Sequence, residues 1–212
     1  MVKQKKSNTT KAKKRGVKIP ELPDNEIVKL VQAGNKNLFS IINERYQGNL
    51  FAYLFRLIGS REEAKDLLQD VLVKAFKNIK SYDTTRNFSS WIYRIAHNES
   101  VNYIRRKGLK RFISWEDIVS AKDKMMSNKA EDGADDIWLR KEKIKEVDAV
   151  INKLPFKYKQ VLMLRYYSDK SYEEIGGILK KPVNTVGTLI SRAKKKMAEE
   201  VMSMEKGKRP SR

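Results

Sequence analysis

The chain has 212 residues, a length that suits one or two small domains rather than one large core. Lys and Arg number 46 against 26 acidic residues, so the net charge of +20 indicates a polyanionic partner, either nucleic acid or an anionic membrane surface. No apolar run approaches the roughly 20 residues of a spanning helix, and no apolar segment follows the basic N-terminus, so we expect a cytoplasmic protein without membrane insertion. With no cysteine and one histidine, His97, the sequence excludes disulfides and thiolate zinc sites, and we expect neither metal nor cofactor.

Charge and apolar content divide the chain into five segments. Residues 1–20 carry eight basic groups and no acid, which predicts a disordered tail that is either solubilising or a nonspecific DNA arm. Residues 108–137 carry five basic and seven acidic groups without sustained apolar periodicity, which predicts a flexible linker. The linker separates two helical domains, 21–107 and 138–203, and a basic tail, 204–212, ends the chain. The predicted fold class is therefore all-α, with two small helical domains.

The first domain opens with three predicted helices. The stretches DNEIVKLVQAG and LFSIINERYQGNLFAYLFRLIG read as helices that end at Gly34 and Gly59. Ser60, with Glu63 three residues later, is a candidate N-cap for the third helix. That helix carries an apolar stripe at helical spacing that is expected to face the core. The stripe consists of Ala64, Leu67, Leu68, Val71, Ala75, Phe76 and Ile79.

A fourth helix, FSSWIYRIAHNESVNYIRRKG, follows the turn-like segment SYDTTRN. Its apolar residues, Phe88, Trp91, Ile92 and Ile95, share one side and are expected in the core. Arg94, Asn98 and Arg105 project together within about 40° on another side, at about 100° per residue. This polar stripe is either a binding surface or a solvated helix face. His97 is expected at the surface, without a catalytic role.

In the second domain, Pro155 fits the first turn of a helix through VLMLRYY, and Ser171 with Glu174 forms a capping box for the next helix. Ile175, Ile178 and Leu179 face inward on that helix, and KKP supplies a turn. The last helix then has apolar packing positions along one side. These positions are Val186, Ile190, Ala193 and Met197.

The opposite side of the last helix is polar over about 100° of arc. It carries Asn184, Thr188, Ser191, Arg192 and Lys195, and Thr185 joins this set of candidate DNA-binding residues. Short polar groups come first and cations follow, an order that suits a recognition helix whose N-terminal residues reach base edges while cations hold phosphates. The pattern predicts a C-terminal helix-turn-helix. The alternative is the solvated face of an ordinary bundle helix.

Two long stretches together resemble bacterial sigma factors, specifically the extracytoplasmic function (ECF) group of the sigma-70 family. The segment EEAKDLLQDVLVKAFKNIKSYD with FSSWIYRIAHNESVNYIRR is similar to conserved region two of that family. The segment LPFKYKQVLMLRYYSDKSYEEIGGILKKPVNTVGTLISRAKKKM is similar to region four. The two matches cover more than half the chain, in order and with plausible spacing.

The resemblance implies a subunit that binds core RNA polymerase and directs it to promoters, recognising both duplex and locally melted promoter DNA. It places Asp66, Gln69 and Asp70, which share a helix face, against the polymerase clamp. In region two it places promoter contacts beside the loop Ser81 through Asn87, and in region four on the last helix. Trp91 and Tyr93 are candidates to stack on bases, with a core position as the alternative that is expected for Trp91. The implied region-two contacts are Arg94, Asn98, Asn102, Arg105 and Arg106. An anti-sigma factor is a further candidate partner.

The sequence departs from the family at a few positions. Gly187 and Leu189 stand where many members have Lys and Arg, which leaves the upstream promoter sequence open. Gly176 and Gly177 each lower helix propensity by roughly 1 kcal/mol relative to Ala, although Gly176 is suited to a close helix approach.

Two other function classes remain to be compared with a sigma factor. A stand-alone helix-turn-helix regulator would leave residues 60–107 unexplained. An enzyme has little support, because the chain contains no phosphate-binding G-x-x-x-x-G-K-[ST] loop, no nucleophile elbow and no histidine or metal constellation.

Overall fold

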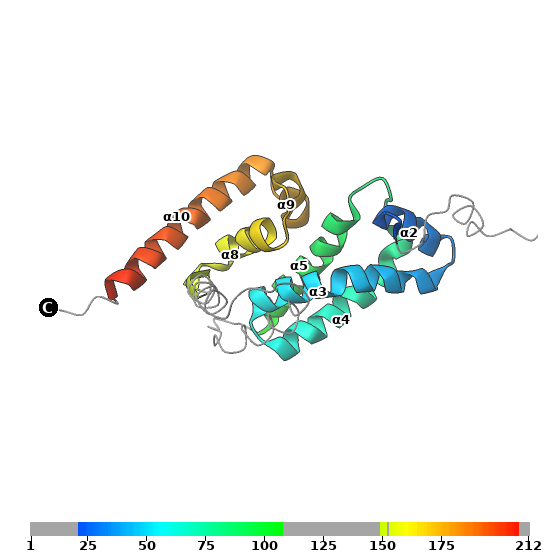
Figure 1. Ribbon diagram of the computed structural model, residues 1–212, viewed down its shortest axis with the longest axis horizontal. Helices are drawn as coiled ribbons and strands as arrows, with labels where there is room; N and C mark the ends of the chain where they lie inside the picture. Colours follow the sequence, from blue (N-terminus) through cyan, green and yellow to red (C-terminus); the bar gives the residue numbers. More distant parts are fainter. Residues whose placement is uncertain (1–20, 108–148, 152, 208–212) are drawn as a thin grey trace, which may run out of the picture.

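The computed structural model describes residues 21–107, 149–151 and 153–207, and within these ranges the regular structure is helical throughout (Figure 1). The predicted linker 108–137, the tail 1–20 and the start of the second predicted domain lie outside the described residues. None of the described helices is both long and apolar enough to cross a membrane.

The first domain is built from α2 (Asp24–Gln32), the short η2 (Lys36–Leu38), α3 (Phe39–Ile58), α4 (Arg61–Asn78), η3 (Ile79–Ser81) and α5 (Phe88–Lys107). The predicted stops are confirmed: Gly34 and Gly59 have φ values of 114° and 84°, a left-handed conformation that favours glycine. The predicted cap is also confirmed, because the Ser60 hydroxyl accepts a hydrogen bond from the backbone N–H of Glu63.

The α4 stripe packs into the core with two exceptions. Its buried members are Ala64, Leu67, Val71, Ala75 and Ile79. Leu68 is half-buried. The assignment of Phe76 to the core is wrong: its side chain is 38% exposed and lies edge-on against Phe39, with ring centroids 5.1 Å apart. Phe76 stands at the border of the stripe, where one side of the ring meets α3 and the other meets solvent.

The second domain contains α8 (Phe156–Leu162), a π-helical turn, η4 (Met163–Tyr167), α9 (Tyr172–Leu179) and α10 (Val183–Gly207). Pro155 stands at the N-cap of α8, and the capping box of Ser171 and Glu174 at the start of α9 is confirmed. The π-helical turn widens the C-terminal end of α8 just before the loop that leads to α9.

The turn between α9 and α10 is tight enough to require a glycine. A Cβ added at Gly176 would stand 2.8 Å from the carbonyl oxygen of Lys181, whose N–H donates back to the carbonyl of Gly176. The expectation that Gly176 permits a close approach is therefore confirmed. Beyond the turn, α10 packs on α8 and α9 through Val186, Ile190 and Ala193, which are buried, and Met197, which is half-buried.

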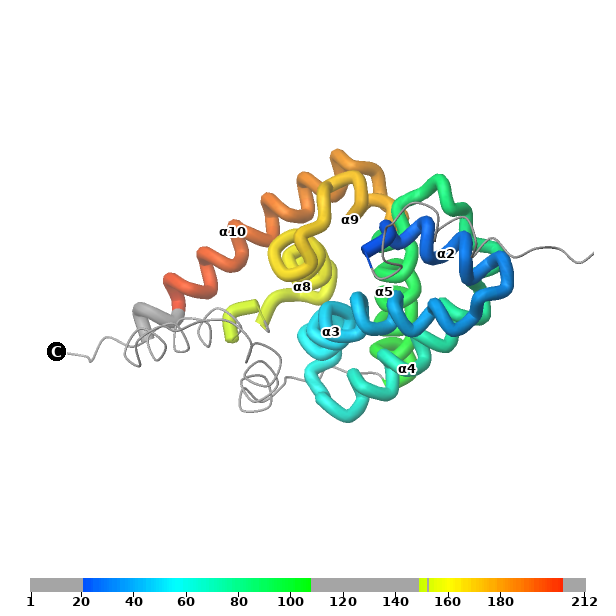
Figure 2. The backbone as a smooth tube through the Cα atoms, turned by 45° about the vertical axis from the view of Figure 1, so that its right-hand side comes forward, coloured from blue at the N-terminus to red at the C-terminus, as the bar shows by residue number. Residues whose placement is uncertain are grey.

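The two domains pack against each other, and α9 lies beside α5 (Figure 2). Buried apolar residues of both domains form one connected core. His97 of α5 is buried in this region, where its ring stacks on Phe156 of α8 at a centroid distance of 6.5 Å. The prediction of a surface histidine is wrong, because the second domain covers that side of α5.

Candidate nucleic-acid interface

One face of α4 presents the predicted polar trio to solvent. Asp66, Gln69 and Asp70 are all exposed, on the side of the helix opposite the buried stripe. Neither carboxylate forms an ion pair with another residue in the described part of the chain, whereas the nearby Lys65 pairs with Glu62 at 3.1 Å. The trio therefore offers two uncompensated negative charges on a rigid helix.

The same face contains an apolar side chain that the sequence reasoning missed. Val73 is 51% exposed and stands seven residues after Asp66, so it lies on the polar face. In the sequence, Val73 is recognisable as a β-branched apolar residue that lies outside the predicted buried stripe. A surface that combines charges with an exposed apolar centre is typical of a protein interface.

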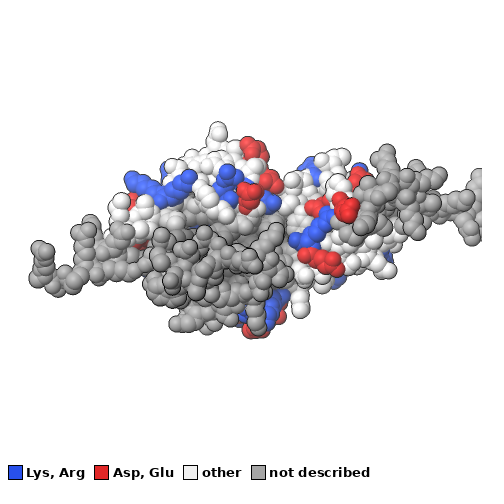
Figure 3. Space-filling view, viewed as in Figure 1, with Lys and Arg blue, Asp and Glu red and all other residues white. Residues whose placement is uncertain are grey.

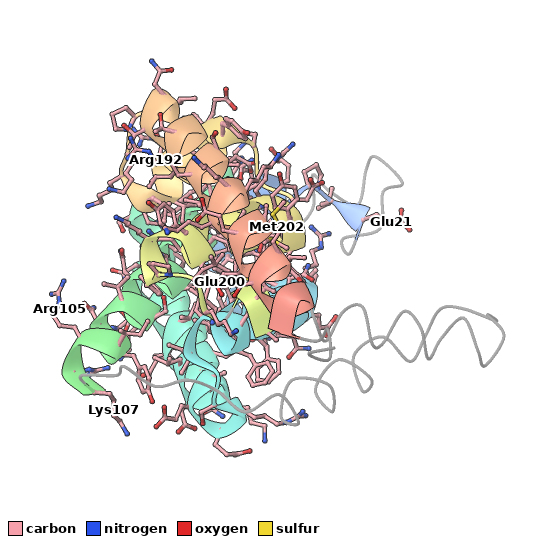
Figure 4. The ribbon with its side chains drawn as sticks, turned by 90° about the vertical axis from the view of Figure 1, so that its left-hand side faces the viewer. Glu21, Arg105, Lys107, Arg192, Glu200 and Met202 are labelled. Atoms are coloured by element: carbon pink, nitrogen blue, oxygen red, sulfur yellow. The ribbon has the colours of Figure 1, made fainter. Side chains whose placement is uncertain are left out.

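The polar stripe of α5 is largely exposed. Asn98, Asn102, Arg105 and Arg106 lie at the surface, whereas Arg94 is half-buried. Arg105 projects outward from the C-terminal end of α5 (Figure 4). The only acidic residue within α5, Glu99, is turned inward and pairs with Lys74 of α4 at 2.6 Å. The stripe therefore remains cationic and amide-rich, which suits phosphates and base edges.

The loop before α5 is anchored by α2, a role that the sequence did not predict. The Asn25 amide donates to the carbonyl of Arg86 at 2.8 Å, and the Gln32 amide donates to the carbonyls of Ile79 and Tyr82. The Tyr82 hydroxyl also donates to the Asn25 side chain. Both ends of the loop are thus held to one helix.

Hydrogen bonds within the loop complete its shape. Asp83 accepts from both the backbone N–H and the hydroxyl of Thr85, and it pairs with Arg86 at 3.1 Å. The Thr85 hydrogen bonds lower the pKa of Asp83, so the carboxylate stays charged. Asn87 caps α5 by accepting from the N–H of Ser90 at 2.9 Å. The loop is preorganised and needs little ordering when a ligand arrives.

A cleft of about 400 Å³ opens between this loop and α5. Its lining consists of Ser81, Tyr82, Asp83, Arg86, Asn87, Ser90, Trp91, Arg94 and Gly177. Trp91 is half-buried rather than fully in the core: it packs on Tyr82 and Phe88, and it also lines the cleft. Aromatic, amide and guanidinium groups around one cleft are the combination that stacks and hydrogen-bonds an unpaired base.

The polar face of α10 that the sequence predicts to contact DNA is exposed along its length. Its members are Asn184, Thr185, Thr188, Ser191, Arg192 and Lys195. Figure 3 shows Lys and Arg side chains gathered where α10 runs in Figure 1, and Figure 4 marks Arg192 on that helix. The Thr188 hydroxyl donates to the carbonyl of Asn184 at 2.9 Å, so its oxygen remains an acceptor.

Lys194 belongs to the same run of basic residues, but its side chain points toward η4 rather than outward with Arg192 and Lys195. Its ammonium lies 5.6 Å from the ring centroid of Tyr166 in η4, and a hydrogen bond with that side chain raises the pKa of Lys194. Among the described residues no group of His, Asp and Glu is arranged to hold a metal ion.

Comparison with known families agrees with the division into two domains. Residues 42–109 match sigma-70 region 2, and residues 144–197 match sigma-70 region 4. The first match contains α4, the loop and α5. The second contains the helix-turn-helix formed by α9 and the start of α10.

Individual relatives and solved structures agree with the family match. The chain is 32% identical to the ECF RNA polymerase sigma factor SigW of Bacillus subtilis over 84% of this chain and 96% of that one. It is 29% identical to the ECF RNA polymerase sigma-E factor of Escherichia coli K12 over 87% and 97%. The fold resembles CnrH, solved in complex with the cytosolic domain of CnrY, with a TM-score of 0.62, 19% identity and coverage of 85% and 97%.

These matches exclude the two alternative function classes, a stand-alone helix-turn-helix regulator and an enzyme. A stand-alone regulator would not contain region 2, and a sigma factor is not an enzyme. The chain therefore belongs to the ECF RNA polymerase sigma factors of the sigma-70 family, the subunits of transcription initiation that bind core RNA polymerase.

Proposed function

We propose that this sigma factor acts in the cytoplasm by holding a separated promoter strand on α5 and its preceding loop, while α10 reads duplex DNA upstream. The observation that carries the proposal is the preformed cleft of about 400 Å³ beside the cationic stripe of α5. Trp91 and Arg94 line that cleft, and Asn98 continues the stripe one turn further along.

The energetics favour such a site. A sigma factor has no nucleotide-driven motor, so the cost of unstacking and unpairing, a few kcal/mol, must be recovered through contacts with the extruded base and with phosphates. The loop is held by α2 through Asn25 and Gln32, and binding therefore spends little free energy on ordering the protein.

The α4 face is the proposed contact with core polymerase. Asp66, Gln69 and Asp70 are exposed on a helix whose opposite side is fixed in the core, so the trio is presented rigidly. Negative charges without partners among the described residues favour a cationic partner surface, and Val73 supplies apolar area at the centre.

The division of labour follows the two proposed domains, 21–107 and 138–203. On α10, the residues nearest the N-terminus of the helix, Asn184 and Thr185, are proposed to reach base edges. Arg192 and Lys195, two turns or more further on, are proposed to hold phosphates.

The test measures permanganate reactivity of unpaired thymines in promoter complexes formed with core polymerase. Replacing both Asn98 and Arg105 by Ala removes polar groups from an exposed face, so the fold should be unchanged while open-complex formation falls severalfold, each lost contact being worth about 1–3 kcal/mol. The matched control replaces Asn37 and Lys36 of η2 by Ala and should leave open-complex formation unchanged. These two residues are exposed and distant from α5 in the sequence.

A template with a preformed mismatched bubble separates opening from other steps. That template avoids the cost of unpairing, so the doubly substituted protein should recover much of its activity on it. Equal reactivity of wild-type and substituted protein on the intact template would reduce the stripe to a solvated helix face.

An anti-sigma factor is a second proposed partner. The structure of the sigma factor RpoE from Bartonella quintana, solved with the anti-sigma factor NepR, is similar to this chain with a TM-score of 0.58 and 22% identity. To test this proposal, the tagged chain is purified from its source cells. Any protein that copurifies with it is then added to a reconstituted transcription reaction. A partner that leaves transcription unchanged would speak against an inhibitor.

A further inference from the structure

The first two turns of α10 expose polar side chains that carry no charge. Residues 183–191 read VNTVGTLIS, so Arg192 is the first cation of the helix. On these turns Asn184, Thr185 and Thr188 are exposed. The N-terminal residues of a recognition helix are the ones that reach base edges in the major groove. The part of α10 placed to meet bases therefore offers amide, hydroxyl and methyl groups in place of guanidinium or ammonium groups.

The two departures from the family pattern lie on either side of this polar face. Gly187 and Leu189 flank Thr188, each about 100° away from it around the helix. A Cβ added at Gly187 would lie 3.7 Å from the ring of Tyr172, which covers the helix backbone at this point. Leu189 is half-buried and packs against the core. One flank of the polar face is thus covered by an aromatic ring, and the other is apolar.

Thr188 presents no hydrogen-bond donor to a ligand. Its hydroxyl donates to the backbone carbonyl of Asn184 at 2.9 Å, within the helix. What remains for a ligand is an acceptor oxygen and a methyl group. Guanine exposes only acceptors, N7 and O6, at its major-groove edge, so it finds no partner in Thr188. Thymine carries a methyl group at that edge, and this group suits the methyl group of Thr188.

The side-chain amide of Asn184 matches adenine. This amide is exposed and makes no hydrogen bond within the described part of the chain. It combines a donor, the NH2 group, with an acceptor, the carbonyl oxygen. Adenine presents the complementary pair at its major-groove edge, because its N7 accepts and its N6 donates. Guanine would place its O6 against the oxygen of Asn184, acceptor against acceptor.

Cations stand before and after the uncharged turns. Lys180 and Lys181 are exposed in the turn that precedes α10, and Arg192 and Lys195 are exposed further along the helix, where Figure 4 marks Arg192. Attraction to phosphates is therefore available without a cation on the turns that face the bases. Different residues of α10 supply affinity for the DNA backbone and discrimination between bases.

We propose that α10 selects A·T base pairs in the upstream promoter element: Asn184 pairs with an adenine, and the methyl group of Thr188 packs on the methyl group of a neighbouring thymine. This inference rests on the proposed function and deepens it, because it names the bases that the helix reads. Guanine is rejected at these positions, since the first two turns of α10 lack the paired donors that Arg offers to its N7 and O6.

Selection from a random duplex library tests the base preference. The full chain is assembled with core polymerase, and short duplexes with a randomised central segment are bound at one salt concentration, recovered and sequenced. The wild-type protein should enrich an A·T pair at the position where Asn184→Ala loses its preference. Ser203→Ala is the matched control and should select the same sequences as the wild-type protein. It removes an exposed hydroxyl from the same helix about 28 Å further along, at about 1.5 Å per residue.

Modified bases in the selected duplex separate direct readout from DNA shape. 7-Deazaadenine lacks the N7 acceptor and uracil lacks the thymine methyl group, while both keep Watson–Crick pairing and the minor-groove edge. At the selected position, 7-deazaadenine should lower the affinity of the wild-type protein by at least about fivefold and should not weaken binding of Asn184→Ala. Uracil should likewise weaken binding of the wild-type protein but not of Thr188→Ser, a variant that keeps the hydroxyl and lacks the methyl group.

The outcomes distinguish this inference from the proposed function. A G·C pair at the position that depends on Asn184 would overturn the inference, and so would a base preference that Asn184→Ala leaves intact. Equal effects of the modified bases on the wild-type protein and the variants would overturn it as well. Salt-dependent binding without any base preference would also overturn it, yet the proposed contact of α10 with duplex DNA would stand. Absence of duplex binding at low and high salt would refute that contact itself.

Discussion

The imidazole ring of His97 on α5 lies nearly parallel to the ring of Phe156 on α8, with 16° between the planes and 6.5 Å between the centroids. On the other side, the Tyr53 hydroxyl and Nδ1 of His97 are 3.2 Å apart and share a hydrogen bond. Burial lowers the pKa of His97 to about 4 from an ordinary 6.5, so the ring is neutral at physiological pH. The one histidine of the chain is thus part of the packing between its domains.

Acidification should destabilise the folded protein through this residue. Between pH 6.5 and pH 4 the unfolded chain binds a proton that the folded chain does not, so stability falls as pH falls across that window. From pH 6.5 to pH 5 the loss should be about 1.5 kcal/mol, because the slope is half of about 1.4 kcal/mol per pH unit at pH 6.5 and approaches the full value near pH 5. Urea unfolding at the two pH values measures it. His97→Gln should flatten this part of the profile, and the same slope in both proteins would assign the acid sensitivity to other groups.

Two adjacent glycines in α9 should respond oppositely to alanine. At Gly176 the new Cβ would stand 2.8 Å from the carbonyl oxygen of Lys181, so the turn into α10 must shift, at a cost of about 1–3 kcal/mol. At Gly177 no atom lies within 4 Å of the new Cβ, and the helix should gain about 0.5–1 kcal/mol. Thermal unfolding of the two single variants checks the contrast, and similar shifts for both would show that the turn is not crowded.

Charge reversal on α4 should weaken polymerase binding without unfolding the helix. Asp66→Lys with Asp70→Lys changes two exposed side chains outside the buried stripe, so helical content should be retained. The affinity for core polymerase, measured by titration, should fall at least tenfold if a cationic surface faces this trio, a change of about 1.4 kcal/mol. Glu44→Lys on the exposed part of α3 is the control for a general charge effect. Unchanged affinity of the double variant would remove this face from the interface.

The exposed Val73 gives a second, uncharged test of the same interface. Val73→Ser removes an apolar side chain that is 51% exposed, so folding stability should change by less than about 0.5 kcal/mol. If Val73 lies at the centre of the polymerase contact, the affinity should fall by about 1 kcal/mol or more. Fluorescence competition against wild-type protein for core polymerase measures the difference. A neutral result, together with an effect of the charge reversal, would place Val73 at the rim.

Local rules in the sequence predicted most helix ends correctly. Gly34 and Gly59 adopt the left-handed conformation that ends a helix, and Ser60 and Ser171 cap the helices that follow them. These features depend only on neighbours within a few residues, so the chain order alone contains them. The π-helical form of Met163–Tyr167 was not predicted, because apolar spacing does not separate it from an α-helix.

Apolar periodicity likewise determined which side of each helix faces its own domain. The recognition helix buries Val186, Ile190 and Ala193, and its polar face is exposed as expected. The prediction that the apolar stripe of α4 is buried was correct at the centre of the stripe and wrong at Phe76. Phe76 lies at the border of the stripe, where burial depends on how far the neighbouring helix extends over the side chain.

The sequence by itself therefore determined the helices, their caps and the resemblance to two sigma regions, all of which depend on residues close together in the chain. Only the tertiary structure decided the burial of His97 and Lys170, the anchoring of the loop by Asn25, and the cleft beside α5. Lys170 meets Ser89 across 81 residues, and Asn25 meets Arg86 across 61. A polar residue on a helix surface has the same periodicity whether water or another domain covers it, so such pairings are fixed by the packing of distant segments and not by any local pattern.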